Sequence, residues 1–116
     1  MKARIAKELE ELINEKIYLD LEVHLLGKKI EGIQKTNQMV SQIEKLVEQK
    51  IKKLKTVNEK LRKQNVKIHP PISDGLFVQY NFYVKNGGYK EGNFRYWKSA
   101  IKFTLNQRLN PFFNGN

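Results

Sequence analysis

The spacing of hydrophobic residues changes several times along the chain, and each change predicts a different element. Residues 2–15 place Ile5, Leu9 and Ile13 at helical spacing with glutamates between them, which is the pattern of a short amphipathic helix. Over residues 17–25 hydrophobic and polar side chains alternate strictly, as they do along a half-buried strand. The chain is therefore expected to begin with a helix that gives way to a strand.

The segment after this alternation leaves two interpretations open. A turn at Gly27-Lys28 and a weaker strand over residues 30–33 would complete an N-terminal β-hairpin. The alternative is a continuous helix through residues 17–33. That helix would bury Leu19 and Leu26 but would leave Leu21, Val23 and Leu25 badly placed, so the hairpin is favoured.

Residues 36–64 carry the longest regular pattern. Apolar residues recur there every seven positions, at Val40, Val47, Leu54 and Leu61, with Ile43 and Val57 between them. This periodicity predicts one long helix. Its stripe is wider than the seam of a two-stranded coiled coil, and Lys50 occupies a position that such a coil would fill with an apolar residue. A wide stripe favours packing against a sheet.

The length of this helix bears on assembly. About 29 residues at ~1.5 Å each give roughly 43 Å, whereas a compact chain of 116 residues is only about 35 Å across. One end of the helix is therefore expected to project beyond the core or to meet another subunit. We expect a homodimer or a larger homo-oligomer.

Proline and glycine mark the change to the C-terminal part of the chain. His69-Pro70-Pro71 cannot continue a helix, and Ser73-Asp74-Gly75 is a turn sequence. A strand is predicted over residues 76–85. It alternates between an apolar face, with Leu76, Val78, Tyr80, Phe82 and Val84, and a second face with Phe77, Gln79, Asn81 and Tyr83. Asn86-Gly87-Gly88 then predicts a hairpin turn.

The end of the chain is expected to be helical. The return strand from Tyr89 is predicted to be short, because Gly92 and Asn93 interrupt it. After it, apolar residues three or four positions apart predict a terminal helix over residues 95–109, which Pro111 stops.

Together these elements predict an α+β fold. In it a long amphipathic helix packs on a small, mostly antiparallel sheet of two hairpins, with short N-terminal and C-terminal helices. One domain is expected over residues 1–110, followed by a tail over residues 111–116.

Charge and cysteine content narrow the class of partner. The formal charge is +10 at pH 7, and it lies on residues 27–116, because residues 1–26 carry more acidic than basic side chains. Such a charge attracts polyanions, acidic proteins and anionic ligands. The chain has no cysteine, which excludes disulfides and cysteine-ligated zinc. No signal peptide and no apolar run of about 20 residues is visible, so a cytoplasmic location without membrane association is expected.

Patterns that would indicate catalysis are weak. If residues 17–25 form a strand, one face carries Tyr18, Asp20, Glu22 and His24, a row that could hold Mg²⁺ in a nuclease. The wet face of an ordinary strand carries the same residue types. No glycine-rich phosphate loop is present, and no serine has an evident base partner. We expect a protein that is not an enzyme and that uses no cofactor or metal.

A mixture of aromatic and basic residues in the C-terminal third is the strongest functional signal. Every aromatic residue except Tyr18 lies between Phe77 and Phe113. Phe82 and Trp97 are expected in the interior, whereas tyrosine hydroxyls need an outlet to water or to a partner. Aromatic rings stack on bases and cations bind phosphates, so nucleic acid is the leading candidate partner.

The residues expected to bind this partner are Phe82, Tyr83, Lys85, Tyr89, Lys90, Asn93, Arg95, Tyr96, Lys98, Lys102 and Arg108. Secondary phosphate contacts are expected from the long helix, at Lys45, Lys52, Lys55, Arg62 and Lys63. Glutamates interleave with the helix cations, which is also the pattern of a solvated helix face.

Two other kinds of partner fit the same chain. A small anionic ligand such as a nucleotide could occupy a pocket near the C-terminal hairpin and helix, stacked on Phe82 or Tyr96 and paired with Arg95 or Arg108. Alternatively, the chain is a regulatory protein-interaction module that assembles through its long helix and docks its Phe112-Phe113 end on a partner such as an acidic protein. The lysine and asparagine usage suits a small bacterial or phage protein.

Overall fold

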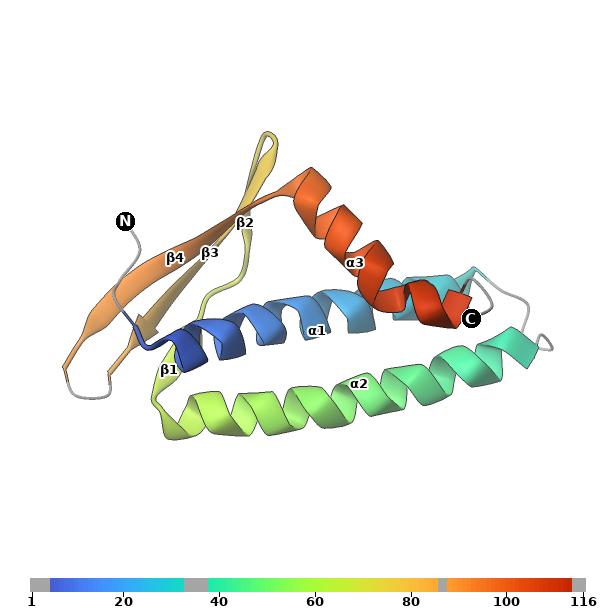
Figure 1. Cartoon of the computed structure of the whole chain (residues 1–116), viewed down its shortest axis with the longest axis horizontal. Coiled ribbons are helices and arrows are strands. Elements are labelled where there is room, and N and C mark those ends of the chain that lie inside the picture. Colours follow the sequence, from blue (N-terminus) through green and yellow to red (C-terminus); the bar gives the residue numbers. More distant parts are fainter. Residues whose placement is uncertain (1–4, 33–37, 86–87, 114–116) are drawn as a thin grey trace.

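The computed structural model describes residues 5–32, 38–85 and 88–113, the last three of these in backbone only. Within them the order is α1 (Lys7–Glu31), α2 (Gln38–Lys63), β1 (Val66–Ile68), β2 (Ile72–Asp74), β3 (Phe77–Val84), β4 (Lys90–Trp97) and α3 (Lys98–Phe113). The described residues form a mixed α+β fold with three helices and a four-stranded antiparallel sheet (Figure 1). The expected α+β class is confirmed.

Strand β3 is the centre of the sheet. On one side β2 pairs with its first part and β1 with its last part, and on the other side β4 pairs along its whole length. The predicted hairpin between residues 76–85 and the return strand is therefore present. Two of its turn residues, Asn86 and Gly87, lie outside the described residues.

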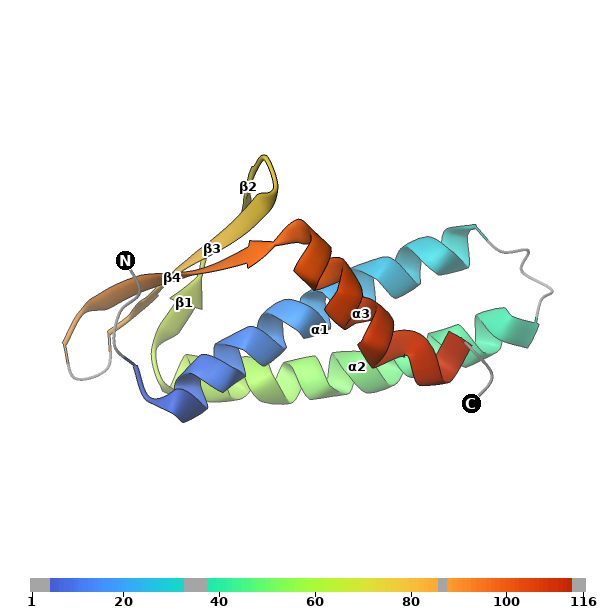
Figure 2. The same ribbon diagram turned by 45° about the horizontal axis from the view of Figure 1, so that its top comes forward.

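The two faces of the sheet have different surroundings. Figures 1 and 2 show α1 and α2 on one side of the sheet. The face turned toward these helices carries the apolar set of β3, with Tyr80, Phe82 and Val84 buried and Val78 packed against them. The predicted alternation is present within Phe77–Val84, where a period of two places the remaining residues on the opposite face. Leu76, which was also expected on the apolar face, precedes the strand and is 69% exposed.

Helix α1 lies between the sheet and α2 (Figures 1 and 2). One buried cluster joins Leu9, Ile13, Ile17 and Leu19 of α1 with Val57 and Leu61 of α2 and with Tyr80, Phe82, Val84 and Phe94 of the sheet. A second cluster joins Leu26 of α1, Ile43 and Leu46 of α2 and Leu109 of α3. The long helix α2 thus reaches the core of the sheet only near its C-terminal end, because α1 occupies the position against the sheet.

The predicted N-terminal hairpin is wrong. Residues 7–31 form a single helix, and the turn expected at Gly27-Lys28 lies inside it. The alternation that suggested a strand has a different cause. Because α1 packs on the sheet, on α2 and on α3, apolar residues on several of its sides are buried, and a helix with that environment does not need a single narrow stripe.

A buried ion cluster joins the three helices. Glu22 of α1 is fully buried, and its Oε1 accepts hydrogen bonds from Nε and Nη2 of Arg108 on α3 at 2.9 and 2.6 Å. Its Oε2 forms an ion pair with Nζ of Lys50 on α2 at 2.7 Å, and Arg108 also pairs with Glu15. A buried carboxylate requires such compensation. The pairing therefore explains why a lysine stands in the apolar stripe of α2.

The return strand is longer than predicted. β4 has eight residues, and Gly92 and Asn93 lie inside it, opposite Phe82 and Asn81 of β3. Pairing with β3 outweighs the weak strand preference of glycine and asparagine, because it buries Phe94 opposite Tyr80.

The terminal helix therefore begins later than predicted. Residues 95–97, expected on the helix, belong to β4, and α3 starts at Lys98, whose N–H donates to the carbonyl oxygen of Leu76 at 2.9 Å. The helix continues to Phe113, so the prediction that Pro111 stops it is wrong.

The molecule is elongated, with extents of 52 × 32 × 23 Å. The 26 residues of α2 span about 39 Å at ~1.5 Å each, so the long helix fits within one chain alongside α1. Its length alone consequently no longer argues for a second subunit.

Candidate functional site

The candidate site is the face of the sheet turned away from α1 and α2, called the outer face below. Cross-strand pairs align its residues in rows: Lys67 with Tyr83, Tyr83 with Glu91, Asn81 with Asn93, Gln79 with Arg95, and Phe77 with Trp97. His69 follows β1, and its N–H donates to the carbonyl oxygen of Asn81 at 2.8 Å. No helix among the described residues covers this face (Figure 2), so its side chains are available to a partner.

Aromatic rings gather at one end of the outer face. The rings of Tyr83 and Tyr89 stack with centroids 5.7 Å apart, and the centroid of the His69 ring lies 5.5 Å from that of Tyr83. The ammonium group of Lys85 lies 5.4 Å from the Tyr83 ring. Tyr89 is 59% exposed, which leaves a wide ring surface for a flat ligand.

A hollow of about 460 Å³ lies beside these rings and is lined by His69, Asn81, Phe82, Tyr83, Tyr89, Glu91, Gly92 and Asn93. The Tyr89 hydroxyl donates to Oε1 of Glu91 at 2.5 Å at its rim. That hydrogen bond raises the pKa of the Tyr89 hydroxyl. The hollow thus combines stacking surface with hydrogen-bonding groups, the usual features of a ligand site.

Carboxamides occupy the middle of the outer face. Asn81 and Asn93 are directly opposite each other, and Nε2 of Gln79 donates to Oδ1 of Asn81 at 2.8 Å. Each carboxamide carries both donors and an acceptor. This row can therefore pair with the polar edge of a base or of a similar planar group.

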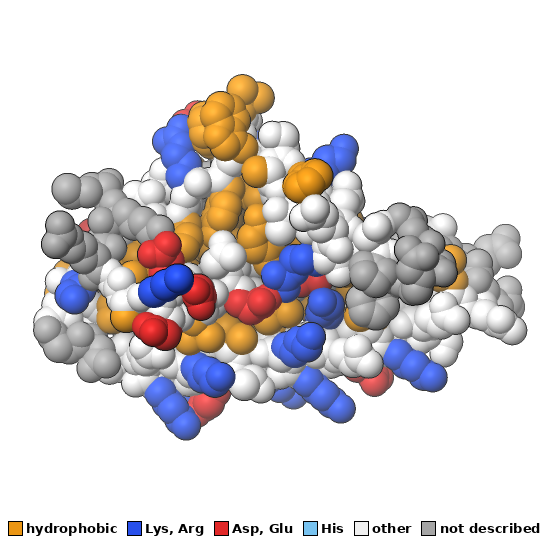
Figure 3. All heavy atoms as spheres, viewed as in Figure 1, with side chains coloured by type: hydrophobic (Ala, Val, Ile, Leu, Met, Phe, Trp, Pro, Cys, Tyr) orange, Lys and Arg blue, Asp and Glu red, His pale blue; other side chains and the backbone are white. Residues whose placement is uncertain are grey.

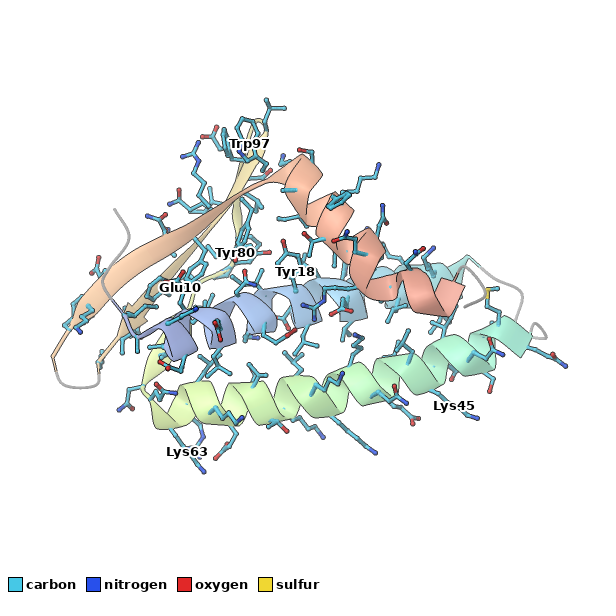
Figure 4. All side chains as sticks on the ribbon, in the orientation of Figure 1. Glu10, Tyr18, Lys45, Lys63, Tyr80 and Trp97 are labelled. Carbon is cyan, nitrogen blue, oxygen red and sulfur yellow. The ribbon has the colours of Figure 1, made fainter. Side chains whose placement is uncertain are left out.

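A second group of aromatic residues lies at the far end of the outer face. The Phe77 and Trp97 rings lie 4.3 Å apart, and the Arg95 guanidinium sits 4.2 Å from the Phe77 ring with a loose ion pair to Asp74 at 3.8 Å. Trp97 is 53% exposed. Figure 4 shows it at the end of the sheet farthest from α1 and α2.

Only some of the predicted site residues meet on this face. Tyr83, Tyr89, Asn93 and Arg95 belong to it, Lys85 lies beside it and Lys90 is exposed at the start of β4. Lys98 and Lys102 are exposed on α3. Three residues lie elsewhere: Phe82 is in the core, Tyr96 is on the helix side of β4 and Arg108 is in the buried ion cluster.

The predicted cations of the long helix lie far from this face. Lys45, Lys52, Lys55, Arg62 and Lys63 are exposed on α2. Figure 4 shows Lys45 and Lys63 pointing away from the sheet, and in Figure 3 basic side chains gather along the lower edge of the molecule, over α2. Arg62 forms an ion pair with Glu59 at 2.6 Å. A ligand on the outer face would not reach these cations at the same time.

The row of polar residues predicted on one face of an N-terminal strand, and considered as a metal site, does not form. Tyr18, Asp20, Glu22 and His24 lie on the helix α1 instead of a strand. Asp20 pairs with Lys16 at 2.7 Å, and Glu22 belongs to the ion cluster. The described residues contain no group of three or more histidine or acidic side chains placed to hold a metal ion.

Sequence reasoning missed several residues of the outer face. Trp97 was expected in the interior, because the helical interpretation placed it on an apolar stripe; as a strand residue it alternates with the inward-facing Phe94 and Tyr96. Gln79, Asn81 and Phe77 were placed correctly on the second face of their strand without a role. One sequence signal could have identified these residues. From Gly92 to Trp97 every second residue belongs to the same face of the sheet, as in β3 on the other side of the hairpin.

Comparison with known proteins gives a family. Residues 4–116 match the family model described as YhjD protein. The chain belongs to the YhjD family. Searches of curated proteins and of solved structures find no match to it. None of the helices in the described part of this YhjD family member is long and apolar enough to span a membrane.

Proposed function

We propose that this YhjD family member binds single-stranded nucleic acid on the outer face of its sheet. The observation that carries the proposal is the arrangement of that face: exposed aromatic rings at both ends, with a row of carboxamides between them. Rings that accept bases by stacking, combined with groups that bind base edges, are the usual means by which proteins hold unpaired bases.

The spacing of the two aromatic groups supports this choice. Tyr83 and Phe77 are six residues apart on β3, which corresponds to roughly 20 Å. An extended single strand can touch both ends at once, and each stacked base contributes about 1–3 kcal/mol. A broad sheet face does not enter the groove of a duplex as a helix or narrow ribbon does, so the surface favours unpaired strands.

The charges around the outer face supply phosphate contacts. Lys67 and Lys85 lie near the tyrosine end, and Arg95 and Lys98 lie near the tryptophan end. Glu91 and Asp74 lower the local positive potential, but the whole chain carries +10. Affinity is therefore expected to fall as salt concentration rises, with a slope that reflects a few phosphate contacts.

A single nucleotide is the second candidate ligand. The hollow of about 460 Å³ beside Tyr83 and Tyr89 has the size of a small-molecule site, and His69, Asn81 and Asn93 could bind its polar groups. This ligand would use only the tyrosine end of the face. Dependence of affinity on oligonucleotide length therefore separates the two candidates.

The experiment is fluorescence anisotropy with labelled single-stranded RNA, single-stranded DNA and duplex DNA, using nuclease-treated protein at several salt concentrations. The proposal predicts that single strands of about eight nucleotides bind more tightly than duplex or a mononucleotide competitor. The double variant Lys67→Glu and Lys85→Glu should weaken binding and flatten the salt slope.

The matched control is Lys52→Glu with Lys55→Glu, which makes the same charge change on α2. It should weaken binding less than the variant on the outer face. If both double variants lose the same amount of affinity, binding depends on net charge alone and the outer face is not the binding site.

A further inference from the structure

Strand β4 has one edge without a partner strand among the described residues. It pairs with β3 along all eight residues, and no other described strand lies on its opposite side. In Figures 1 and 2 β4 runs along the margin of the sheet. An edge of this length is a template for pairing with another chain.

The register identifies which backbone groups face this edge. The N–H of Lys98 donates to the carbonyl oxygen of Leu76, so the residue pair 98 and 76 is a hydrogen-bonded pair of the ladder. Such pairs alternate in an antiparallel ladder. The N–H and C=O groups of Glu91, Asn93, Arg95 and Trp97 therefore point away from β3, toward the open edge.

The side chains along this edge have charges that match those of the same edge in a second copy. Glu91 and Arg95 have opposite charges and lie two residues on either side of Asn93. If two copies of β4 pair antiparallel with Asn93 opposite Asn93, each Glu91 lies opposite Arg95 of the other copy. All of these positions belong to the set with open backbone groups, so the same register satisfies both the hydrogen bonds and the charges.

Neighbouring registers do not give this match. A shift of two residues in one direction places Glu91 opposite Asn93, and in the other direction it places Asn93 opposite Arg95. Both shifts keep the backbone hydrogen bonds but lose the two ion pairs. The charge pattern thus selects one register and makes self-pairing attractive, whereas like charges on an edge strand oppose it.

The helix side of the same edge is also complementary. In this register Lys90 of one copy lies opposite Tyr96 of the other. Tyr96 lines a hollow of about 490 Å³ at the edge, together with Glu10, Glu11, Asn14, Asn93, Phe94 and Arg95. Lys90 is exposed in the single chain, and the hollow offers two carboxylates next to the position that its ammonium group would take.

The present contacts of Glu91 and Arg95 do not prevent this pairing. Glu91 is exposed and accepts one hydrogen bond from Tyr89. Arg95 lies 3.8 Å from Asp74, in a pair whose side chains are 47% and 79% exposed, and its guanidinium lies 4.2 Å from the Phe77 ring centroid. Exposed pairs of this kind contribute little, so both side chains can change partner at small cost.

We propose that the chain forms a twofold symmetric homodimer by antiparallel pairing of β4 with β4 of a second copy, centred on Asn93. The interface is isologous, as in most homodimers, and the two sheets become one. The outer faces then form a continuous surface on which Trp97 of one copy lies opposite Tyr89 of the other. The dimer is inferred from the open edge of β4 and from the charges of Glu91 and Arg95, and it does not depend on nucleic-acid binding.

Charge exchange tests the interface. Sedimentation of nuclease-treated protein across a range of concentrations should show a species of twice the 13.7 kDa of the chain. Glu91→Arg alone and Arg95→Glu alone each place like charges opposite one another and should shift the population to monomer. The double variant Glu91→Arg with Arg95→Glu restores opposite charges and should restore the dimer.

A crosslink tests the register. Hydrogen-bonded partners in an antiparallel ladder have Cα atoms about 5.5 Å apart, within the range that a disulfide spans. The chain has no cysteine, so Asn93→Cys should give a disulfide-linked dimer under mild oxidation. Gln79→Cys, on the same face but on the central strand, should stay largely uncrosslinked.

Circular dichroism and thermal melting confirm that each variant is folded. A wild-type chain that stays monomeric at all concentrations would overturn the proposal. So would a dimer that is unaffected by the single charge changes, or one that the double exchange does not restore. None of these outcomes bears on nucleic-acid binding, which is measured separately.

Discussion

The hydroxyl of Tyr96 donates a hydrogen bond to Oδ1 of Asn14 across 2.7 Å, and so ties β4 to the first half of α1. The Tyr96 ring also meets the buried rings of Tyr18 and Tyr80 edge-on, at centroid distances of 6.0 and 6.1 Å. Figure 4 shows Tyr18 and Tyr80 between α1 and the sheet. Because Tyr96 stands between Arg95 and Trp97, this anchor fixes the strand that presents both residues on the outer face.

Removal of this hydroxyl is expected to destabilise the fold. Tyr96→Phe leaves the carboxamide of Asn14 without its partner, and the free energy of unfolding should fall by about 1–2 kcal/mol in urea denaturation. Tyr89→Phe is the control, because its hydroxyl bonds Glu91 in an exposed position. That change should stay within about 0.5 kcal/mol. Equal effects of the two changes would contradict the anchoring role.

Stability is expected to fall at alkaline pH. Burial, followed by the neighbouring Tyr18, raises the pKa of the Tyr96 hydroxyl above its usual value, and burial followed by the nearby Asp20 raises the pKa of Tyr80. The folded state thus favours the neutral phenols. This contribution is present below about pH 10 and is lost as pH rises through the raised pKa values. Denaturant midpoints at pH 9 and pH 11 measure the loss, which should be smaller in Tyr96→Phe.

Loss of the Glu22 charge is expected to have a larger effect. Glu22→Gln leaves the buried Lys50 without its carboxylate and removes one of the two carboxylates that pair with Arg108, the other being Glu15. The breaking of such a cluster costs about 3–5 kcal/mol. Glu44→Gln makes the same chemical change at an exposed position of α2 and should stay within about 0.5 kcal/mol. Thermal and urea unfolding of both variants compare them. A Glu22→Gln protein as stable as the control would mean that the cluster contributes no net stability.

Two glycines should respond to alanine in opposite directions. Gly27 lies inside α1 with open space at its Cβ position, so Gly27→Ala should stabilise the protein by about 0.5–1 kcal/mol. Gly75 turns the chain between β2 and β3 with φ +57. Gly75→Ala should destabilise by about 1 kcal/mol, because the left-handed region is strained for alanine. The two differences in urea denaturation should therefore have opposite signs.

The sequence predicts the long helix and the central strand because the buried side chains of each lie on one face. The stripe of α2 faces α1 over most of its length. In β3 one face is apolar, and the other mixes aromatic rings with carboxamides. Local periodicity is sufficient in both cases. The same reasoning fails for α1, whose burial comes from the sheet, α2 and α3 together.

The outer face could be predicted only in part. The tyrosines and cations near the hairpin are visible as a composition signal, but Trp97 reaches this surface because β4 pairs with β3 through Gly92 and Asn93. Arg108 resembles a ligand-binding arginine in the sequence, yet its partners are carboxylates 86 and 93 residues away. Such long-range pairing has no local signal in a single sequence.

The fluorescence of Trp97 tests the central claim most directly. It is the single tryptophan of the chain and lies half-exposed on the outer face, so its emission reports on this surface alone. Titration with a single-stranded oligonucleotide of about eight nucleotides at low salt should quench the emission to saturation. Tyr89→Ala, at the other end of the face, should weaken the apparent affinity about fivefold or more, since one stacked base contributes about 1–3 kcal/mol. Emission that stays unchanged when oligonucleotide is added to the folded protein would contradict the account.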